Sequence, residues 1–249
     1  MDLTARVQGA RRHPDRVLLE GFHAVKHAVR FGAEILDLVV RDRTEALTLA
    51  EALGPDLVGA IEEAQEVTDP RFRTLLPSPP STGILAVARR KAWTLEDAMH
   101  RKQPEPTVLL EDPRNLGNVG AVIRNAAGLG AKGVVVVGEH DPWAPDAVRG
   151  AAGLQFAVPV VGVPQLDALA PGEGAPPILA VDPEGPPLRP GVLPSAAVLA
   201  FGSERTGLSP ELKALAAGAV SIPMRDGVSS LNLATSVGIG LYAWTLQTL

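Results

Sequence analysis

Short apolar runs alternate with helical segments from residue 107 onward, and this alternation restricts the fold more than any other feature of the chain. The runs are rich in valine and largely uninterrupted by polar residues, as at 133–137. Uninterrupted apolar strands are typical of a parallel sheet that helices cover on both faces. We therefore predict a doubly wound α/β domain with a parallel sheet, in which ligands bind beyond the carboxyl ends of the strands.

The same pattern gives the elements of this domain. The predicted strands are 107–110, 133–137, 158–161, 178–181, 197–201 and 219–222. The predicted helices are 119–129, 144–150, 166–170, 210–217 and 233–246.

The residues before this region predict a second, smaller α/β domain. Its predicted elements are a helix with apolar spacing over 17–31, a strand at 35–40, a helix at 44–53, a strand at 84–88 and a short helix at 94–100. Composition changes over 91–105, which we interpret as the boundary. We therefore predict two domains, residues 1–100 and residues 104–249.

Length and composition exclude several classes of protein. With 249 residues, of which 46% are apolar, the chain can bury the cores of two domains. No stretch approaches the ~20 apolar residues of a membrane span, and no apolar stretch follows the basic opening segment, so we expect a cytoplasmic protein without membrane contact. The absence of cysteine excludes disulfides, thiolate zinc sites and cysteine nucleophiles. His23 and His27 lie one helical turn apart but lack further ligands, so we expect no metal site.

The net charge of -5 argues against a protein that holds nucleic acid by bulk electrostatics alone. Residues 1–103 contain 15 basic and 15 acidic residues, against 8 and 13 in the remainder. The basic residues of the first part cluster, at Arg6, Arg11, Arg12 and Arg16, at Arg71 and Arg73, and at Arg89, Arg90 and Lys91. These clusters are either solvated surface or, if a long polyanion binds, its contacts.

A nicotinamide-dependent enzyme is one alternative, because residues 128–133 match G-x-G-x-x-G. The dinucleotide motif requires a strand before the glycines and a helix after them. Here the predicted helix precedes the glycines and the predicted strand follows, so they more simply end a helix and turn into a strand.

Three segments carry polar residues directly after predicted strands: NVGAVIR at 118–124, FGSERTG at 201–207, and IPMRDGVSSLN at 222–232. Each has an ordinary structural explanation. Asn118 can cap the helix that follows, Arg124 can be a surface cation, Glu204 can be solvated, and the polar residues before 233 can cap the last helix. Their joint occurrence at three strand ends is what indicates a site.

Together and in this order, the segments resemble the three motifs of the SpoU (TrmH) branch of the SPOUT RNA methyltransferases. That pattern runs N-x-G-A-x-x-R, then G-x-E-x-x-G, then I-P-M followed by S-L-N. The strong resemblance spans residues 107–245, and a weaker one, in EGFHAVKHAVRFGAEILDLVV and STGILAVARR, covers the first domain. The family commonly continues S-L-N-x-S-x-A, whereas Ala234 stands here at the serine position and Ser236 at the alanine position. This difference removes a polar contact from position 234.

The resemblance implies a C-terminal trefoil knot that shapes a pocket for S-adenosylmethionine, and a first domain that binds the RNA substrate. Backbone groups of Gly202, Ile222 and Leu231 would bind the cofactor, with the segment ILAVDPEG on the adenine side. It also implies a homodimer with sites near the subunit interface. The apolar C-terminal stretch is suited to that interface, and equally to completing the core.

The reaction that the resemblance implies is methyl transfer to a ribose 2′-hydroxyl. Asn118 and Arg124 would contact the phosphate and ribose beside the target. Ser230 and Asn232 would orient the hydroxyl and the methionyl end of the cofactor, and Glu204 would hold Arg124 or its loop in place. Because a guanidinium is a poor proton acceptor, we expect Arg124 to stabilise the developing alkoxide.

A 2′-hydroxyl acceptor implies RNA. A separate N-terminal domain of this type is found in ribosomal-RNA members of the family, so ribosomal RNA is the expected substrate and transfer RNA the alternative. A protein that keeps the fold and binds RNA without catalysis is a further alternative, which cofactor binding would distinguish.

Overall fold

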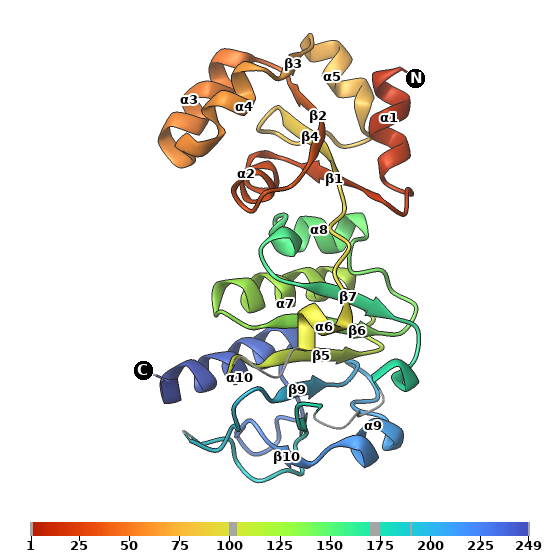
Figure 1. The fold of residues 1–249 in the computed structure, drawn as a ribbon, viewed down its shortest axis with the longest axis vertical. Coiled ribbons are helices and arrows are strands. Elements are labelled where there is room, and N and C mark those ends of the chain that lie inside the picture. Colours follow the sequence, from red (N-terminus) through yellow and green to blue (C-terminus); the bar gives the residue numbers. More distant parts are fainter. Residues whose placement is uncertain (1, 100–103, 170–174, 190, 249) are drawn as a thin grey trace. The chain divides into compact units, whose positions relative to one another are not determined.

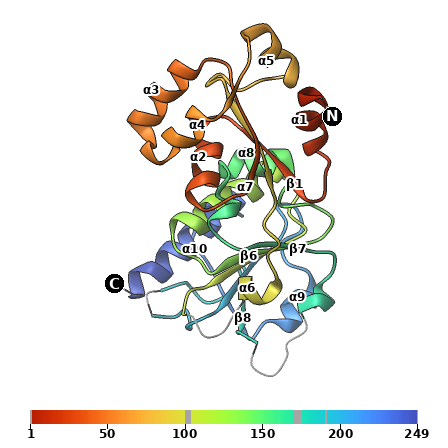
Figure 2. The same cartoon turned by 45° about the horizontal axis from the view of Figure 1, so that its top comes forward.

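The computed structural model describes residues 2–99, 104–169, 175–189 and 191–248, and of residue 248 only the backbone. Within them the chain forms two compact units. The first unit comprises residues 1–92 and 143–157, and the second comprises 93–142 and 158–249. Figures 1 and 2 show the elements of each unit.

The first unit is built on a mixed four-stranded sheet of order β1-β4-β2-β3. Its strands are β1 (Arg16–Glu20), β2 (Ile35–Val40), β3 (Gln65–Glu66) and β4 (Ile84–Arg89). Its helices are α1 (Leu3–Ala10), α2 (Phe22–Arg30), α3 (Arg43–Leu53), η1 (Pro55–Leu57), α4 (Val58–Glu62), α5 (Asp69–Leu75), α8 (Pro145–Ala151) and η2 (Leu154–Phe156). In both views α1 and α5 lie on one side of the strands, and α3 and α4 on the other (Figures 1 and 2).

One prediction for this unit is wrong at its start. Residues 16–20 form strand β1, so residues 17–20 of the predicted helix over 17–31 are strand, and α2 begins only at Phe22. Val17, Leu18 and Leu19 are all buried, and β1 pairs antiparallel with β4. Gly21, with φ +93°, separates this strand from α2. Three consecutive buried residues fit a strand with both faces covered, a pattern that apolar spacing alone does not distinguish from a helix.

The second unit confirms the predicted parallel sheet. Its six strands have the order β10-β8-β9-β5-β6-β7, and every neighbouring pair is parallel. The strands are β5 (Thr107–Glu111), β6 (Gly133–Val137), β7 (Val160–Val163), β8 (Ile178–Val181), β9 (Val198–Phe201) and β10 (Gly218–Val220). The helices are α6 (Leu95–Met99), α7 (Leu116–Gly128), η3 (Leu166–Leu169), α9 (Pro210–Leu215) and α10 (Leu233–Thr248).

The side chains of the central strands are buried on both faces of the sheet. One cluster joins the buried faces of the strands, among them Leu109 and Val135, to residues of α6 and α9 such as Leu95 and Leu212. Helices α7 and α10 pack against each other and contact β6 and β9 respectively. The valine-rich runs are therefore buried on both faces, as their composition indicates.

Smaller differences from the predicted elements have local causes. Residues 166–169 form a 3-10 turn in place of the predicted α-helix, whose last residue lies outside the described part. Strand β7 begins at Val160, directly after Pro159, which has no amide hydrogen for the ladder. The glycines of G-x-G-x-x-G lie at the end of α7, in the turn and at the start of β6, which confirms the helix-before-strand order.

Candidate active site

A pocket of about 700 Å³ lies in the second unit and is formed by loops at strand ends. The loops that line it follow β8, β9 and β10 along the chain, and residues of α9 and α10 complete it. Six predicted site residues line the pocket: Gly202, Glu204, Ile222, Ser230, Leu231 and Asn232. The position agrees with the rule that ligands of parallel sheets bind beyond the carboxyl ends of the strands.

The loop after β9 is tight, and Gly202 is the residue that makes it possible. A Cβ atom at position 202 would lie 2.0 Å from the carbonyl carbon of Gly207 and 2.2 Å from the amide nitrogen of Leu208. Ser203 and Gly207 exchange backbone hydrogen bonds of 3.2 and 3.0 Å. The chain therefore folds back on itself directly beside the pocket, and no side chain fits at position 202.

Glu204 joins the three polar segments into one network. Asn118 donates from Nδ2 to Glu204 Oε1 at 2.7 Å, and the backbone amide of Arg114 donates to Oε2 at 3.1 Å. Asn232 in turn donates from Nδ2 to Asn118 Oδ1 at 3.1 Å. Burial raises the pKa of Glu204, but the hydrogen bonds from Asn118 and Arg114 lower it, and the pKa lies below its ordinary value. The carboxylate is therefore ionised at neutral pH and fixed in orientation.

Asn115 and Asn232 hold the starts of helices, whereas Asn118 does not. Asn115, not Asn118, caps α7, because its Oδ1 accepts the backbone amide of Asn118 at 3.1 Å. The side chain of Asn118 is thereby available for Glu204, and the capping explanation for Asn118 is wrong. Asn232 does hold the start of α10, since its Oδ1 accepts from the amides of Ala234 and Thr235, while its Nδ2 reaches Asn118.

Arg124 lies apart from this network. It is exposed on α7, it does not line the pocket, and within the described ranges no hydrogen bond or ion pair joins its side chain to Glu204. Glu204 instead holds Asn118 and the loop before α7. The neighbouring Asn125 donates to the carbonyl of the buried Ala234 at 2.8 Å, so the contact at position 234 is made by the backbone.

The pocket also contains an ion pair that the sequence pattern does not reveal. Lys213 Nζ lies 2.7 Å from Asp182 Oδ2, and both residues line the pocket. Hydrogen bonding by Lys213 lowers the pKa of Asp182. Asp182 could have been found as a polar residue directly after a predicted strand, whereas Lys213 on α9 carries no such signal.

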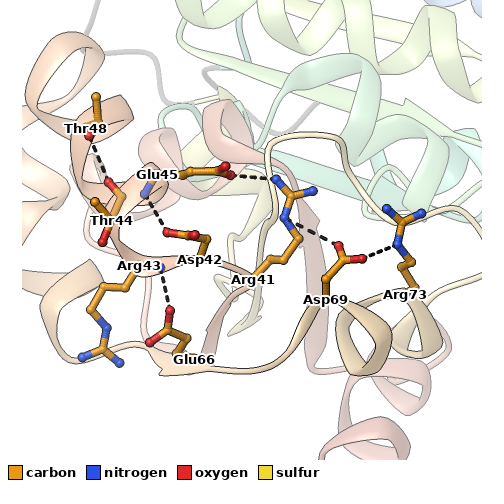
Figure 3. A network of polar contacts seen from close by, with 9 residues as sticks. All are labelled: Arg41, Asp42, Arg43, Thr44, Glu45, Thr48, Glu66, Asp69 and Arg73. Carbon is orange, nitrogen blue, oxygen red and sulfur yellow. Dashed lines mark hydrogen bonds and ion pairs between the residues drawn. The ribbon is translucent and has the colours of Figure 1, made fainter.

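The basic clusters of the first unit are largely neutralised within it. Arg41 lies between Glu45 and Asp69, and Arg73 also contacts Asp69, as Figure 3 shows. Further ion pairs join Arg6 to Asp37, Arg11 to Glu20, Arg30 to Asp56, Arg71 to Asp2 and Arg89 to Glu34. Arg12 is exposed, and no acidic partner of its side chain occurs among the described residues. Five of the nine basic residues in the predicted clusters therefore have a carboxylate partner.

Of the histidine pair in the first unit, His27 makes a hydrogen bond within that unit, and His23 is exposed. The Nδ1 atom of His27 lies 2.8 Å from the carbonyl oxygen of Ala152, and burial lowers the pKa of this histidine. Across the described part of the chain, no group of three or more histidine, aspartate or glutamate residues is arranged to hold a metal ion. No described helix is both long and apolar enough to cross a membrane.

Comparison with known proteins places this site in a family. The model of the SpoU rRNA Methylase family matches residues 105–242. A 23S rRNA (uridine(2479)-2'-O)-methyltransferase from Streptomyces viridochromogenes is 31% identical over 246 residues, which cover 92% of this chain and 75% of that protein. A 23S rRNA (adenosine(1067)-2'-O)-methyltransferase from Streptomyces laurentii is 35% identical over 140 residues, which cover 54% of this chain and 52% of that protein. The match thus spans about half the length of the second relative.

A solved structure agrees over nearly the whole chain. The AdoMet-bound rRNA methyltransferase from Sinorhizobium meliloti has 25% identity and a TM-score of 0.76, covering 99% of this chain and 93% of that one. Both units therefore have counterparts in one known protein. From the family match, the relatives and the motif loops around the pocket, it follows that the chain belongs to the SpoU rRNA methylase family.

Proposed function

We propose that this protein transfers a methyl group from S-adenosylmethionine to a ribose 2′-hydroxyl of ribosomal RNA. The observation that carries the proposal is the pocket, which residues of the second and third polar segments line. Hydrogen bonds from Asn118 to Glu204 and from Asn232 to Asn118 connect these two segments to the first. The relatives named above act on 23S rRNA at ribose 2′-oxygens.

The residues present fit the cofactor. A volume of about 700 Å³ is within the range of pockets for ligands of this size. The loop that folds back at Gly202 lines the pocket, and no side chain occupies that position. Gly202, Ile222 and Leu231 would hold S-adenosylmethionine, which supplies an electrophilic methyl carbon when bound.

The polar residues can then be given roles toward the acceptor. Ser230 and Asn232, both on the pocket wall, would orient the ribose hydroxyl and the methionyl end of the cofactor. Glu204 would hold Asn118 in place, because its two oxygens already accept from Asn118 and from the loop before α7. Orientation of this kind is the main contribution that a protein makes when the cofactor carries the reactive group.

Arg124 would act on the substrate from outside the pocket wall. It is exposed on the same helix as Asn118, six residues further along. A guanidinium donates to phosphate and to a developing alkoxide but accepts a proton poorly. We therefore assign Arg124 to electrostatic stabilisation, with the phosphate or ribose beside the target as its partner.

RNA recognition is assigned to residues 1–100, and methyl transfer to residues 104–249. Ribosomal RNA is favoured because the relatives that match most of this chain include a 23S rRNA enzyme. Transfer RNA is the second candidate. The C-terminal knot, the cytoplasmic location and the absence of membrane contact stay predictions.

We further infer a homodimer. Ile239, Tyr242 and Leu246 are exposed apolar residues of α10, and their spacing of three and four residues places them on one face of that helix. A second copy of the chain would cover this face. Light scattering of the purified protein tests this: a dimeric mass for the wild type and a monomeric mass for Tyr242→Asp support it, and a monomeric wild type contradicts it.

Calorimetric titration tests the proposal at the cofactor step. S-adenosylmethionine is expected to bind one site per chain, and reduced nicotinamide dinucleotide is expected not to bind. Absence of S-adenosylmethionine binding would contradict the assignment of the pocket. Binding without methyl transfer to any RNA would favour the non-catalytic alternative.

A further inference from the structure

Glu111 is a buried carboxylate that the proposed mechanism does not use. It is the last residue of β5, and it does not line the pocket. Its residue exposure is only 9%, so it needs partners inside the protein. It has them in Ser209: the amide nitrogen of Ser209 donates to Oε2 at 2.8 Å, and Ser209 Oγ donates to Oε1 at 2.5 Å.

Ser209 is the residue at which the pocket loop ends. The loop runs from Gly202 to Leu208 and carries Glu204, and α9 begins directly after Ser209. Ser209 Oγ also accepts the amide of Leu212 at 3.0 Å and thereby caps α9. Glu111 therefore fixes both the end of the loop and the start of the helix.

A second carboxylate holds the same helix from the other side. Lys213 of α9 pairs with Asp182, which directly follows β8. In the sheet, β9 lies between β8 and β5. The loop that leaves β9 is thus followed by α9, which is attached to the ends of both neighbouring strands, β8 and β5. Figure 1 shows α9 on the side toward which the β9 arrow points.

Glu111 and Glu204 hold two loops through hydrogen bonds. The first loop, residues 112–115, follows β5, and the second, residues 202–208, follows β9. Glu111 precedes the first loop and holds the end of the second, whereas Glu204 belongs to the second loop and accepts from Arg114 in the first. The first loop is thereby held by a carboxylate of the second, and the end of the second loop is held by the carboxylate that precedes the first. This arrangement restricts the pocket loop before any ligand enters, and a loop that is already ordered loses less entropy on binding.

We propose that Glu111 is a positioning residue for cofactor binding: through Ser209 it holds the loop 202–208 in the shape that accepts S-adenosylmethionine. This inference rests on the proposed function of the pocket. Glu111 does not line the pocket, so its effect on the affinity for S-adenosylmethionine is transmitted through Ser209 and the loop.

Three variants separate this role from a purely structural one. Glu111→Leu removes both acceptors and leaves the donors of Ser209 unpaired, Glu111→Gln keeps one acceptor, and Thr107→Val is the matched control. Thr107 is a buried residue at the opposite end of β5, and its Oγ1 donates to the carbonyl of Ala98 at 2.6 Å. Glu111→Leu removes two hydrogen bonds at one end of β5 and Thr107→Val removes one at the other end, but only the first change touches the pocket loop.

The measurements are the Kd for S-adenosylmethionine by calorimetry, the Tm, and amide hydrogen exchange over residues 203–208. For Glu111→Leu we expect a Kd about tenfold higher or more, with faster exchange in the loop, because hydrogen bonds to a charged group are among the stronger ones. Glu111→Gln should fall between this variant and the wild type. Thr107→Val should lower the Tm and leave the Kd unchanged.

The proposal is overturned if Glu111→Leu binds within twofold of the wild type, or if Thr107→Val raises the Kd as much at a comparable loss of Tm. Should Glu111→Leu fail to fold, Ser209→Ala and Ser209→Thr repeat the test, since threonine keeps the hydroxyl and alanine does not. Failure of the wild type to bind S-adenosylmethionine would instead reject the proposed function, so the two failures are distinguishable.

Discussion

Gly202 illustrates how single residues define this site. Its lack of a side chain allows the backbone of Gly207 and Leu208 to pass at a distance that a Cβ could not tolerate. Glu204, two residues later, then reaches Asn118 and the loop before α7. In the motif G-x-E-x-x-G, the first glycine is therefore required because the backbone packs against it, and the glutamate is required because it accepts hydrogen bonds from the first segment.

Replacement of Gly202 by alanine should abolish tight cofactor binding. The added methyl group would lie 2.0 Å from a backbone atom, so the loop must move away from its present course. We expect the Kd for S-adenosylmethionine to rise at least about tenfold, with the protein still folded. Gly128→Ala is the matched control, because nothing lies within 4 Å of a Cβ there and the helix tolerates it. Equal affinity of Gly202→Ala and wild type would refute this role.

Arg124→Lys tests the need for a guanidinium. Lysine keeps the charge but lacks the planar donors that contact two oxygens at once. If Arg124 stabilises a developing alkoxide, kcat should fall about 10²-fold, as for loss of one donor in other sites of this kind, while the Kd for S-adenosylmethionine stays unchanged. Single-turnover rates with saturating RNA measure this, and a variant that keeps nearly full turnover would show that charge alone suffices.

At the scale of elements, the sheet of the second unit was predictable, and the polar contacts of its loops were not. Valine runs such as 133–137 are buried on both faces, so composition alone identifies them. Strand β1 was missed because Val17 to Leu19 carry no period that separates strand from helix. The Lys213–Asp182 and Glu111–Ser209 contacts join residues far apart in the chain, and no local pattern encodes such pairings.

The attachment of α9 to β8 should show a defined pH dependence. Because Lys213 lowers the folded-state pKa of Asp182, the stabilisation is present above the unfolded pKa of about 3.9 and is lost as the pH falls through the folded value. The pKa of Lys213 is raised, so on the alkaline side the stabilisation is lost only above its ordinary value of about 10.4. Asp182→Asn should therefore lower the Tm by an amount that is constant from about pH 5 to 9.

Below about pH 4 the Tm values of Asp182→Asn and the wild type should converge. The difference at neutral pH should be small, because Lys213 is partly exposed and the pair is screened by solvent. Thermal denaturation across this pH range is the measurement. A Tm difference that persists unchanged at pH 3 would mean that Asp182 stabilises through something other than its charge.

At the scale of the whole molecule, charge is mostly balanced internally. The net charge is -5, and the arginines of the first unit are largely paired with carboxylates (Figure 3). We therefore expect the affinity for RNA to depend on the cations without a carboxylate partner and on shape. The sequence left open that the basic clusters of the first unit contact a polyanion. Most residues of these clusters are already paired with carboxylates.

The salt dependence of RNA binding should therefore be shallow. We expect the plot of log affinity against log salt to have a slope of only about -2 to -3, since each phosphate contact contributes about 0.7 to 0.9. Arg12→Gln should reduce its magnitude by about one contact. Arg71→Gln should leave it unchanged, because Arg71 is already paired with Asp2. A steep slope, or equal effects of the two variants, would contradict this view of the first unit.

The most direct test of the account is transfer of labelled methyl from S-adenosylmethionine to purified RNA. Ribosomal and transfer fractions are assayed separately, the products are digested to nucleosides, and Gly202→Ala serves as the comparison at a cofactor concentration below its Kd. We predict label in a single 2′-O-methyl nucleoside from the ribosomal fraction, and much less label with the variant. Label on a base, label only in transfer RNA, or equal label with Gly202→Ala would contradict the proposed reaction, substrate or site respectively.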